Sequence, residues 1–204
     1  MRAIRVLICA CLVGVLAMPL GAQVNKESPD LTVILDFKGP HSQTSLKEME
    51  REAGRILKSS GFRLGWGLLG QNPNATYNDL VVFTFRGACE FVPAPPRNDE
   101  LGPYALTRMT DGEVLPFGEV DCDRVGGAVR SAISGGDFAR GDELVGRAMG
   151  RVLAHELVHM MTKSVRHARE GVQRSALSGR QLIEPVLPLS AFDIERLQQE
   201  RGVR

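Results

Sequence analysis

The sequence carries no excess charge of either sign. Its 25 Lys and Arg residues nearly balance 24 Asp and Glu residues, which gives a formal net charge of +1 at pH 7. It contains no basic run and no basic stripe interleaved with aromatic residues, so its charge gives no reason to expect binding to nucleic acid or to an acidic membrane surface. The 43% of apolar and 24% of charged residues are ordinary for a globular protein. We therefore expect a folded domain without a nucleic-acid partner.

Cysteine is also scarce, and no Cys-x-x-Cys pair occurs among the four cysteines. A cysteine-based metal site is therefore not expected, because such sites draw their thiolates from closely spaced pairs. Cys9 and Cys11 fall within an N-terminal apolar run. Cys89 and Cys122 remain as an even pair, which either forms one disulfide in an oxidising compartment or stays as two buried thiols. In both cases we expect their role to be structural.

The chain has one pronounced apolar run, and it is too short to cross a bilayer as a helix. Residues 6–16 follow Arg2 and Arg5 and precede the small residues that end at Ala22. This order is typical of a secretory signal peptide, and a retained membrane anchor is the alternative. We predict that residues 1–22 are a signal peptide. The mature chain is then a secreted or periplasmic monomer without membrane contact.

The first half of the mature chain has the pattern of strands around one helix. Residues 32–37, 62–69 and 79–86 are rich in β-branched and apolar side chains and predict three strands. Between the first two, a helix is expected from Ser45, which fits a capping box with Glu48, to a stop at Gly61. A strand, a helix and a strand in this order form a right-handed crossover in a parallel sheet. Residues 106–120 hold two extended pieces around Asp111–Gly112, which indicates a hairpin at the sheet edge.

The second half is predicted to be mainly helical. A long helix is expected from an N-cap at Asp142 to Met161. Ser190 then caps a final helix, with Asp193 three residues further on in the manner of a capping box. Two prolines exclude a helix over residues 182–189. The predicted fold class is α+β, with a twisted and mostly parallel sheet, an antiparallel edge strand, a long helix and a C-terminal helix.

The long helix contains the motif His155-Glu156-Leu157-Val158-His159. Four residues along a helix advance by about 400°, slightly more than one full turn. The two imidazoles therefore point the same way and can share one tetrahedral zinc ion. Glu156 follows the first histidine directly, where its carboxylate reaches a zinc-bound water instead of the metal and can take its proton. The alternative is a helix with two solvent-facing histidines.

A catalytic zinc ion needs a third protein ligand and one open position. We expect His167 to supply this ligand, because it is the only histidine after the motif. On an unbroken helix His167 would lie about 12 Å beyond the motif. The helix therefore has to end near residues 162–164, and the chain has to turn back. Glu170, followed by the permissive Gly171, is the second candidate for this ligand, and Glu184 is the third.

Two segments resemble the metzincin clan of zinc peptidases, and within it the matrixin type. The first is Ala154-His155-Glu156-Leu157-Val158-His159, and the second, residues 189–198, resembles the C-terminal helix of matrixin catalytic domains. Thr162 and Val165 stand where metzincins have a glycine and a third histidine, and no methionine or tyrosine follows the motif helix. The resemblance implies a zincin-like fold, with an extended peptide bound along the edge strand within residues 106–120.

Together these residues predict a secreted zinc metalloendopeptidase, with one zincin-like catalytic domain over residues 23–204. Zn²⁺ is held by His155, His159 and His167, and Glu156 activates the metal-bound water that hydrolyses a peptide or protein substrate. Two alternatives are a zinc hydrolase with a non-peptide or very narrow substrate and a zinc-binding module without catalysis. The presence of Glu156 argues against the module, because a purely structural metal site has no use for a base.

Overall fold

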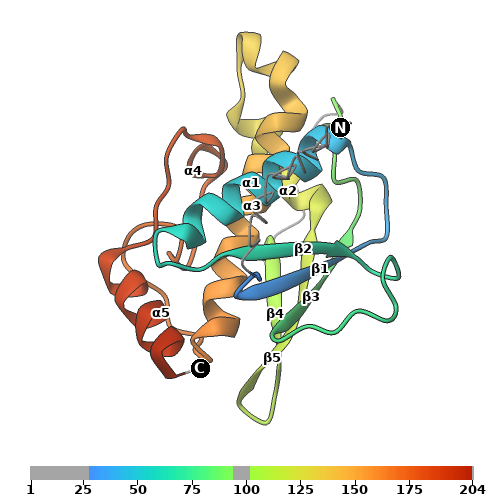
Figure 1. The fold of residues 1–204 in the computed structure, drawn as a ribbon. Helices are drawn as coiled ribbons and strands as arrows, with labels where there is room; N and C mark the ends of the chain where they lie inside the picture. Colours follow the sequence, from blue (N-terminus) through green and yellow to red (C-terminus); the bar gives the residue numbers. More distant parts are fainter. Residues whose placement is uncertain (1–27, 94–101, 204) are drawn as a thin grey trace, which may run out of the picture.

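Five strands form one sheet in the computed structural model, which describes residues 28–93 and 102–203 (Figure 1). The strands are β1 (Leu31–Phe37), β2 (Leu64–Leu68), β3 (Leu80–Arg86), β4 (Ala105–Thr110) and β5 (Glu113–Asp121). Their order across the sheet is β2-β1-β3-β5-β4, and all neighbours are parallel except β4 and β5. The α+β class, the mostly parallel sheet and the antiparallel edge strand are therefore confirmed.

The hairpin between β4 and β5 turns where the sequence predicted. Asp111 and Gly112 have φ angles of 49° and 83°, the left-handed pair that a two-residue hairpin turn requires. The pairing of the two strands is irregular between Thr107 and Met109. Such irregularities bend a strand and redirect its side chains, and this one lies in the part of β4 that borders the functional site.

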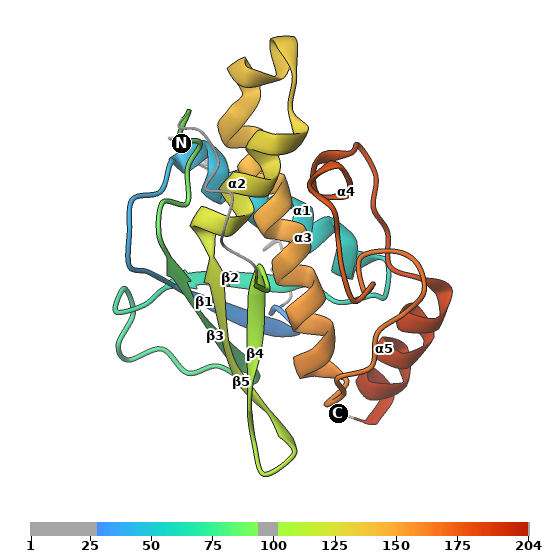
Figure 2. The same ribbon diagram turned by 180° about the vertical axis from the view of Figure 1, so that it is seen from behind.

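Helices α1 and α3 cross one another, and α3 runs alongside the edge strand β4 (Figures 1 and 2). The helices are α1 (Gln43–Lys58), α2 (Cys122–Ala132), α3 (Gly141–Met161), α4 (Gly179–Ile183) and α5 (Ala191–Val203), with the 3-10 turn η1 (Gly135–Arg140) before α3. Helix α1 connects β1 to β2 as the predicted crossover. Buried apolar side chains from the sheet and the helices form one connected core.

Two glycines allow α3 to approach α1 closely. A Cβ atom on Gly146 would lie 2.4 Å from the carbonyl oxygen of Ser45, and one on Gly150 would lie 2.7 Å from that of Met49. Both distances are far inside van der Waals contact, so a larger residue at either position would push the helices apart. This close contact fixes the axis of α3, and with it the direction of the motif side chains.

Two helix starts differ from the sequence prediction. Ser42 caps α1 by accepting a hydrogen bond from the Ser45 backbone N–H at 3.0 Å, so Ser45 is an internal residue of the helix. The buried Ser45 hydroxyl instead donates to the backbone carbonyl of Asp142 at 3.0 Å. Asp142 does not cap α3, because its carboxylate accepts from the Phe91 backbone N–H at 2.7 Å. Both polar side chains are used for tertiary contacts, which local sequence spacing cannot show.

The sequence pattern also gives no indication of helices α2 and α4. Gly126 lies inside α2 beside a second glycine, and glycine is among the weakest helix formers. The helix is capped nonetheless, because the Asp121 carboxylate accepts from the Arg124 backbone N–H at 3.0 Å. Helix α4 ends at Ile183, so the exclusion of a helix over residues 182–189 is wrong for the first two of those residues.

A disulfide joins Cys89 to Cys122, with 4.9 Å between their Cα atoms. It ties the segment after β3 to the first residue of α2. A crosslink between residues that are 33 positions apart restricts the unfolded chain and so favours the folded state. Of the two interpretations of this cysteine pair, the structure shows the disulfide.

The structure tests the prediction for the C-terminal helix but not the one for the N-terminus. The predicted cap of α5 is confirmed, because the Ser190 hydroxyl accepts from the Asp193 backbone N–H at 3.1 Å. The predicted signal peptide, residues 1–22, lies outside the described residues. Among the residues that are described, none belongs to a helix both long and apolar enough to span a membrane.

Candidate metal centre

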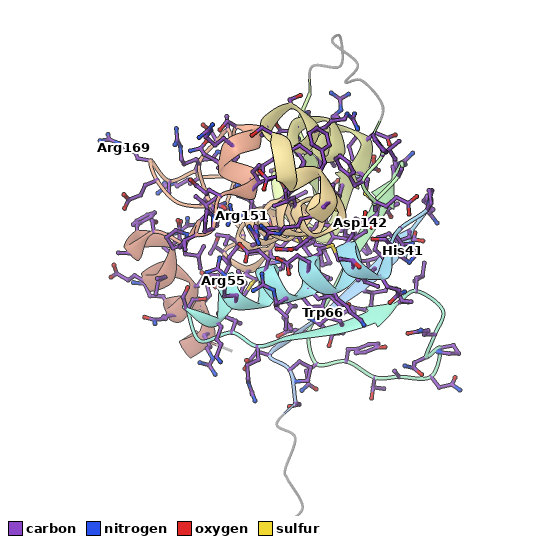
Figure 3. All side chains as sticks on the ribbon, turned by 90° about the horizontal axis from the view of Figure 1, so that it is seen from above. His41, Arg55, Trp66, Asp142, Arg151 and Arg169 are labelled. Carbon is purple, nitrogen blue, oxygen red and sulfur yellow. A yellow bond between two sulfur atoms is a disulfide. The ribbon has the colours of Figure 1, made fainter. Side chains whose placement is uncertain are left out.

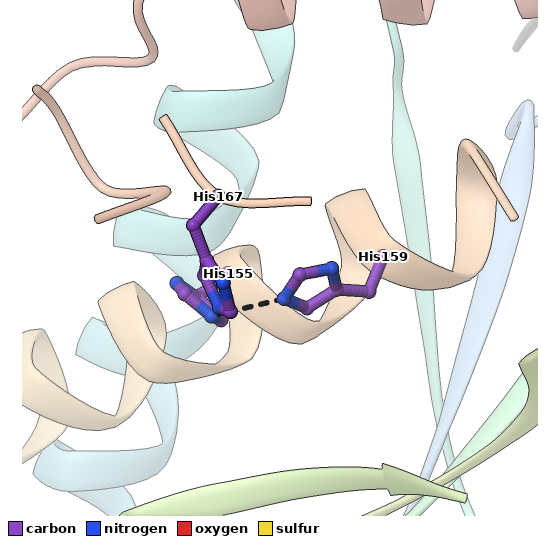
Figure 4. Close-up of side chains that lie close together, drawn as sticks. All are labelled: His155, His159 and His167. Carbon is purple, nitrogen blue, oxygen red and sulfur yellow. Dashed lines mark hydrogen bonds between the residues drawn. The ribbon is translucent and has the colours of Figure 1, made fainter. Parts of the chain in front are cut away.

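Helix α3 brings two histidines of the motif to one point. Leu157 and Val158 are fully buried in the core, which fixes the rotation of the helix about its axis. His155 and His159 lie one turn apart on the other side, and their rings point toward one another (Figure 4). The helical spacing of the motif therefore produces the predicted convergence.

The chain turns back immediately after α3. The helix ends at Met161, and Lys163 adopts a left-handed φ of 47°, which is uncommon for a residue with a side chain. The returning loop is closed by a hydrogen bond from the Ala168 N–H to the Gln173 carbonyl at 2.9 Å. His167 lies in this loop and approaches the helix, as predicted for a third ligand.

The hydrogen bonds of the two helix histidines determine where their protons lie. His155 Nδ1 is 2.9 Å from the Val172 carbonyl oxygen, and His159 Nδ1 is 2.6 Å from that of Ser164. A carbonyl oxygen can only accept, so each Nδ1 carries the proton and each Nε2 of the neutral ring carries none. The two Nε2 atoms nevertheless face each other at 3.1 Å (Figure 4, dashed line). Two lone pairs in this position repel unless a cation joins them.

His167 completes a three-histidine cluster. One ligand nitrogen from each of His155, His159 and His167 lies within 4.8 Å of the others, and this group could hold a metal ion. The exposure increases from the buried His159 to the exposed His167, so the cluster is open to solvent on one side. The other candidates, Glu170 and Glu184, are not members of this group.

Burial lowers the pKa of both helix histidines. Removal from water is the largest cause for His155 and for His159, and the repulsion of neighbouring histidines acts in the same direction. The hydrogen bonds to backbone carbonyls oppose this effect and do not overcome it. Both rings are therefore neutral near neutral pH, which is the form that binds a metal ion.

Glu156 lies beside the cluster without belonging to it. Its side chain is buried, and its Oε2 accepts a hydrogen bond from the Thr107 hydroxyl of β4 at 2.6 Å. Burial raises the pKa of Glu156, and the Thr107 bond and the nearby histidines only partly oppose that effect. A carboxylate with a raised pKa exchanges protons more readily near neutral pH, so Glu156 is suited to act as a base and then as an acid.

A cleft of about 530 Å³ opens over the cluster and Glu156. One wall consists of residues 102–107 with Met109 and Val114, the other of Val165, His167 and residues 174–177, and α3 contributes Val152, His155, Glu156 and His159 between them. The edge strand therefore lines one side of the cleft and the returning loop lines the other. The three histidines and Glu156 are therefore accessible from the cleft.

The structure adds two residues that the sequence did not reveal, Thr107 and Gln173. Gln173 is fully buried, and its Oε1 has no hydrogen-bond partner within the described part of the chain. Its Nε2 is 3.3 Å from Nδ1 and 3.2 Å from Nε2 of His159. An atom almost equidistant from both ring nitrogens, at this range, can only lie over the face of the ring. Gln173 therefore packs its amide against a predicted metal ligand.

Comparison of this chain with models of known protein families, with curated proteins and with solved structures finds no match. The geometry of the three-histidine cluster, Glu156 and the cleft therefore carries the functional argument.

Proposed function

We propose that the protein is a secreted zinc metalloendopeptidase with a zincin-like fold. The observation that carries the proposal is the pair of facing, unprotonated Nε2 atoms of His155 and His159, joined by His167 in an open cleft. With zinc–nitrogen bonds of about 2.0–2.1 Å, two ligand nitrogens of a tetrahedral site lie roughly 3.3 Å apart. The observed separation of 3.1 Å between the two helix histidines is compatible with one metal ion bridging both rings. A zinc ion held here would polarise a carbonyl group and lower the pKa of water to about 7.

The residues around the metal site then transfer protons and hold the reacting groups in place. Glu156 takes a proton from the attacking water and passes it to the amine that leaves the cleaved bond. The Thr107 hydroxyl holds the Glu156 carboxylate in place for both transfers. The carbonyls of Val172 and Ser164 fix the rings of the two helix histidines in the tautomer that leaves Nε2 free.

The position of β4 supports a peptide as the substrate. It is the last strand of the sheet, and the residues of its first half line the cleft. An extended peptide can add to such an edge through backbone hydrogen bonds, while the cleft selects its side chains. The long α3, the edge strand beside it and the C-terminal α5 also follow the element order that the metzincin resemblance implies.

The open cleft favours an enzyme over a zinc-binding module without catalysis. A structural zinc site is closed by four protein ligands, whereas a catalytic one keeps a free position. Here three histidines converge, and the cleft lies over them. A zinc hydrolase acting on a non-peptide substrate would use the same residues, so only its substrate distinguishes it from a peptidase.

The proposal is tested with the mature protein, residues 23–204, loaded with zinc and incubated with denatured casein. We expect cleavage, and we expect Glu156→Ala to lower its rate by about 10²- to 10⁴-fold while zinc content is unchanged. Equal rates for both proteins would contradict the role of Glu156. Hydrolysis of simple esters without cleavage of any peptide would favour the non-peptide hydrolase.

A further inference from the structure

The two walls of the cleft differ in charge. The wall formed by β4 and the residues before it contains no charged side chain among the described lining residues, whereas the opposite wall carries Arg174. Apart from the histidines, the charged groups that line the cleft are Glu156 and Arg174. Glu156 is buried and bonded to Thr107, and it serves as the proposed base. Arg174 is therefore the permanent cation that a ligand in the cleft would meet.

Arg174 belongs to a basic segment of an almost neutral chain. The loop from α3 to α4, residues 162–178, contains Lys163, Arg166, Arg169 and Arg174 but only one acidic residue, Glu170. All four cationic side chains are exposed. Within residues 28–93 and 102–203, none of these four forms an ion pair, although most other arginines there are paired with carboxylates. The loop thus carries a net positive charge, and its Arg174 lines the cleft.

The backbone holds Arg174 at a fixed place beside the histidines. Arg174 and Ala168 form a β-bridge, and the Ala168 N–H donates to the carbonyl of the preceding Gln173 at 2.9 Å. Gln173 itself is fully buried against His159. The base of the Arg174 side chain is therefore anchored one residue from a group that packs on the cluster, while its guanidinium is free to meet a ligand.

We propose that Arg174 forms an anion subsite, so that the cleft selects substrates with a carboxylate near the bond that is cleaved. This proposal rests on the proposed function, because it assigns a substrate class to the same cleft. A guanidinium binds a carboxylate through two parallel hydrogen bonds, a geometry that a lysine cannot reproduce. The carboxylate is either an acidic side chain or the free C-terminus of the substrate.

The subsite is tested first by binding, without any need for turnover. The probes are the monohydroxamates of succinic, glutaric and adipic acid, each compared with the neutral analogue in which an amide replaces the carboxyl group. The hydroxamate binds zinc, and the chain length varies the distance to the acid. For at least one chain length, we expect the acid to bind the zinc-loaded protein about three- to tenfold more tightly than its amide.

Two variants show whether Arg174 causes this preference. Arg174→Ala should bind each acid and its amide equally. Arg169→Ala is the matched control, because Arg169 comes from the same loop, lies at the outer edge of the molecule (Figure 3) and does not line the cleft. It should keep the preference. Equal binding of acid and amide by the unaltered protein at every chain length, or a preference that survives Arg174→Ala, would overturn the proposal.

Peptides then separate the two sources of the carboxylate. Internally quenched peptides with an amidated C-terminus carry Glu or Gln at each position near the cleaved bond, and a second set carries a free C-terminus instead. Faster cleavage of the Glu peptides, lost in Arg174→Ala, assigns an acidic side chain, and faster cleavage of the second set assigns the C-terminus. If the neutral hydroxamates fail to bind and no peptide is cleaved, the metallopeptidase proposal itself fails. If peptides are cleaved without regard to charge, the anion subsite alone fails.

Discussion

Helix α3 carries two polar clusters one turn apart, and they differ in how completely their atoms are paired. Arg151, labelled in Figure 3, is fully buried. Its nitrogens donate to the Glu52 carboxylate and to the carbonyls of Gln181 and Glu184 at 2.9, 2.6 and 2.5 Å. Four residues on, Nε2 of His155 faces another unprotonated nitrogen. A cluster whose donors all meet acceptors holds the fold together. A cluster whose lone pairs converge is suited to bind a cation.

Breaking the saturated cluster should have the largest effect on stability. Arg151→Met removes the buried one of the two arginines that bind Glu52, and a broken buried ion pair costs about 3–5 kcal/mol. We expect the lower end of this range, because Arg55 keeps its 2.8 Å contact with Glu52. Urea unfolding of both proteins measures the difference.

A double variant distinguishes the cost of leaving one buried charge from the cost of losing the ion pair itself. Arg151→Met combined with Glu52→Met removes both charges and should recover a large part of the lost stability, because apolar replacements of a buried pair are often tolerated. A single variant as stable as the unaltered protein would contradict the structural role assigned to Arg151.

Loosening Glu156, the proposed base beside the open cluster, should have the next largest effect, and this effect should be on catalysis instead of stability. Thr107→Val removes the hydroxyl that holds Glu156, and we expect kcat/KM for peptide cleavage to fall about tenfold. Burial raises the pKa of Glu156 and the Thr107 bond partly opposes it, so removing the bond raises that pKa further. The base works deprotonated, and the acid limb of the pH profile should therefore move to higher pH. Thr107→Ser, which keeps the hydroxyl, should leave both quantities unchanged.

Removing the unpaired amide oxygen of Gln173, which packs against His159, should stabilise the protein by a smaller amount. A buried polar group without a partner costs roughly 1–3 kcal/mol, and Gln173 carries such an oxygen. Gln173→Met has a similar volume and no such group, so the free energy of unfolding of the zinc-free protein should rise by about 1 kcal/mol. A loss of stability, or of bound zinc, would instead show that the amide acts on the site.

Acid should weaken the saturated cluster gradually. Burial alone would raise the pKa of Glu52, but the bonds from Arg55 and Arg151 outweigh it and hold that pKa below its ordinary value of 4.5. The unfolded state then binds the proton more readily than the folded state. This stabilisation is present above about pH 4.5 and is lost as the pH falls through the lower folded value. The double variant Arg151→Met with Glu52→Met should lose less stability between pH 6 and pH 3, as measured by urea unfolding.

The sequence predicts the part of the open cluster that depends on local spacing. The i, i+4 spacing of His155 and His159 determines their convergence on any helix, and the helix end before His167 follows from the distance that this residue must cover. The Asp111–Gly112 turn and the cap at Ser190 are also local signals, and the structure contains both.

The parts that the sequence does not predict depend on tertiary contacts. Thr107 meets Glu156 across 49 positions of sequence, and Glu52 meets Arg151 across 99. Neither pair has a spacing that marks it in advance. Nothing in the sequence distinguishes Gln173 from an exposed polar loop residue. It is buried against His159 only because of the path of the returning loop.

The most direct test of the open cluster is the zinc content of the mature protein and of its His167→Ala variant. We expect one zinc per chain, with an affinity that falls in the variant by more than the roughly 10- to 100-fold that removing a hydrogen-bond partner of a ligand costs. Glu170→Ala, the matched change in the same loop, should bind zinc normally. Full zinc binding by His167→Ala would show that a different residue is the third ligand. An unaltered protein that binds no zinc in a buffer without chelators would contradict the account of the metal centre.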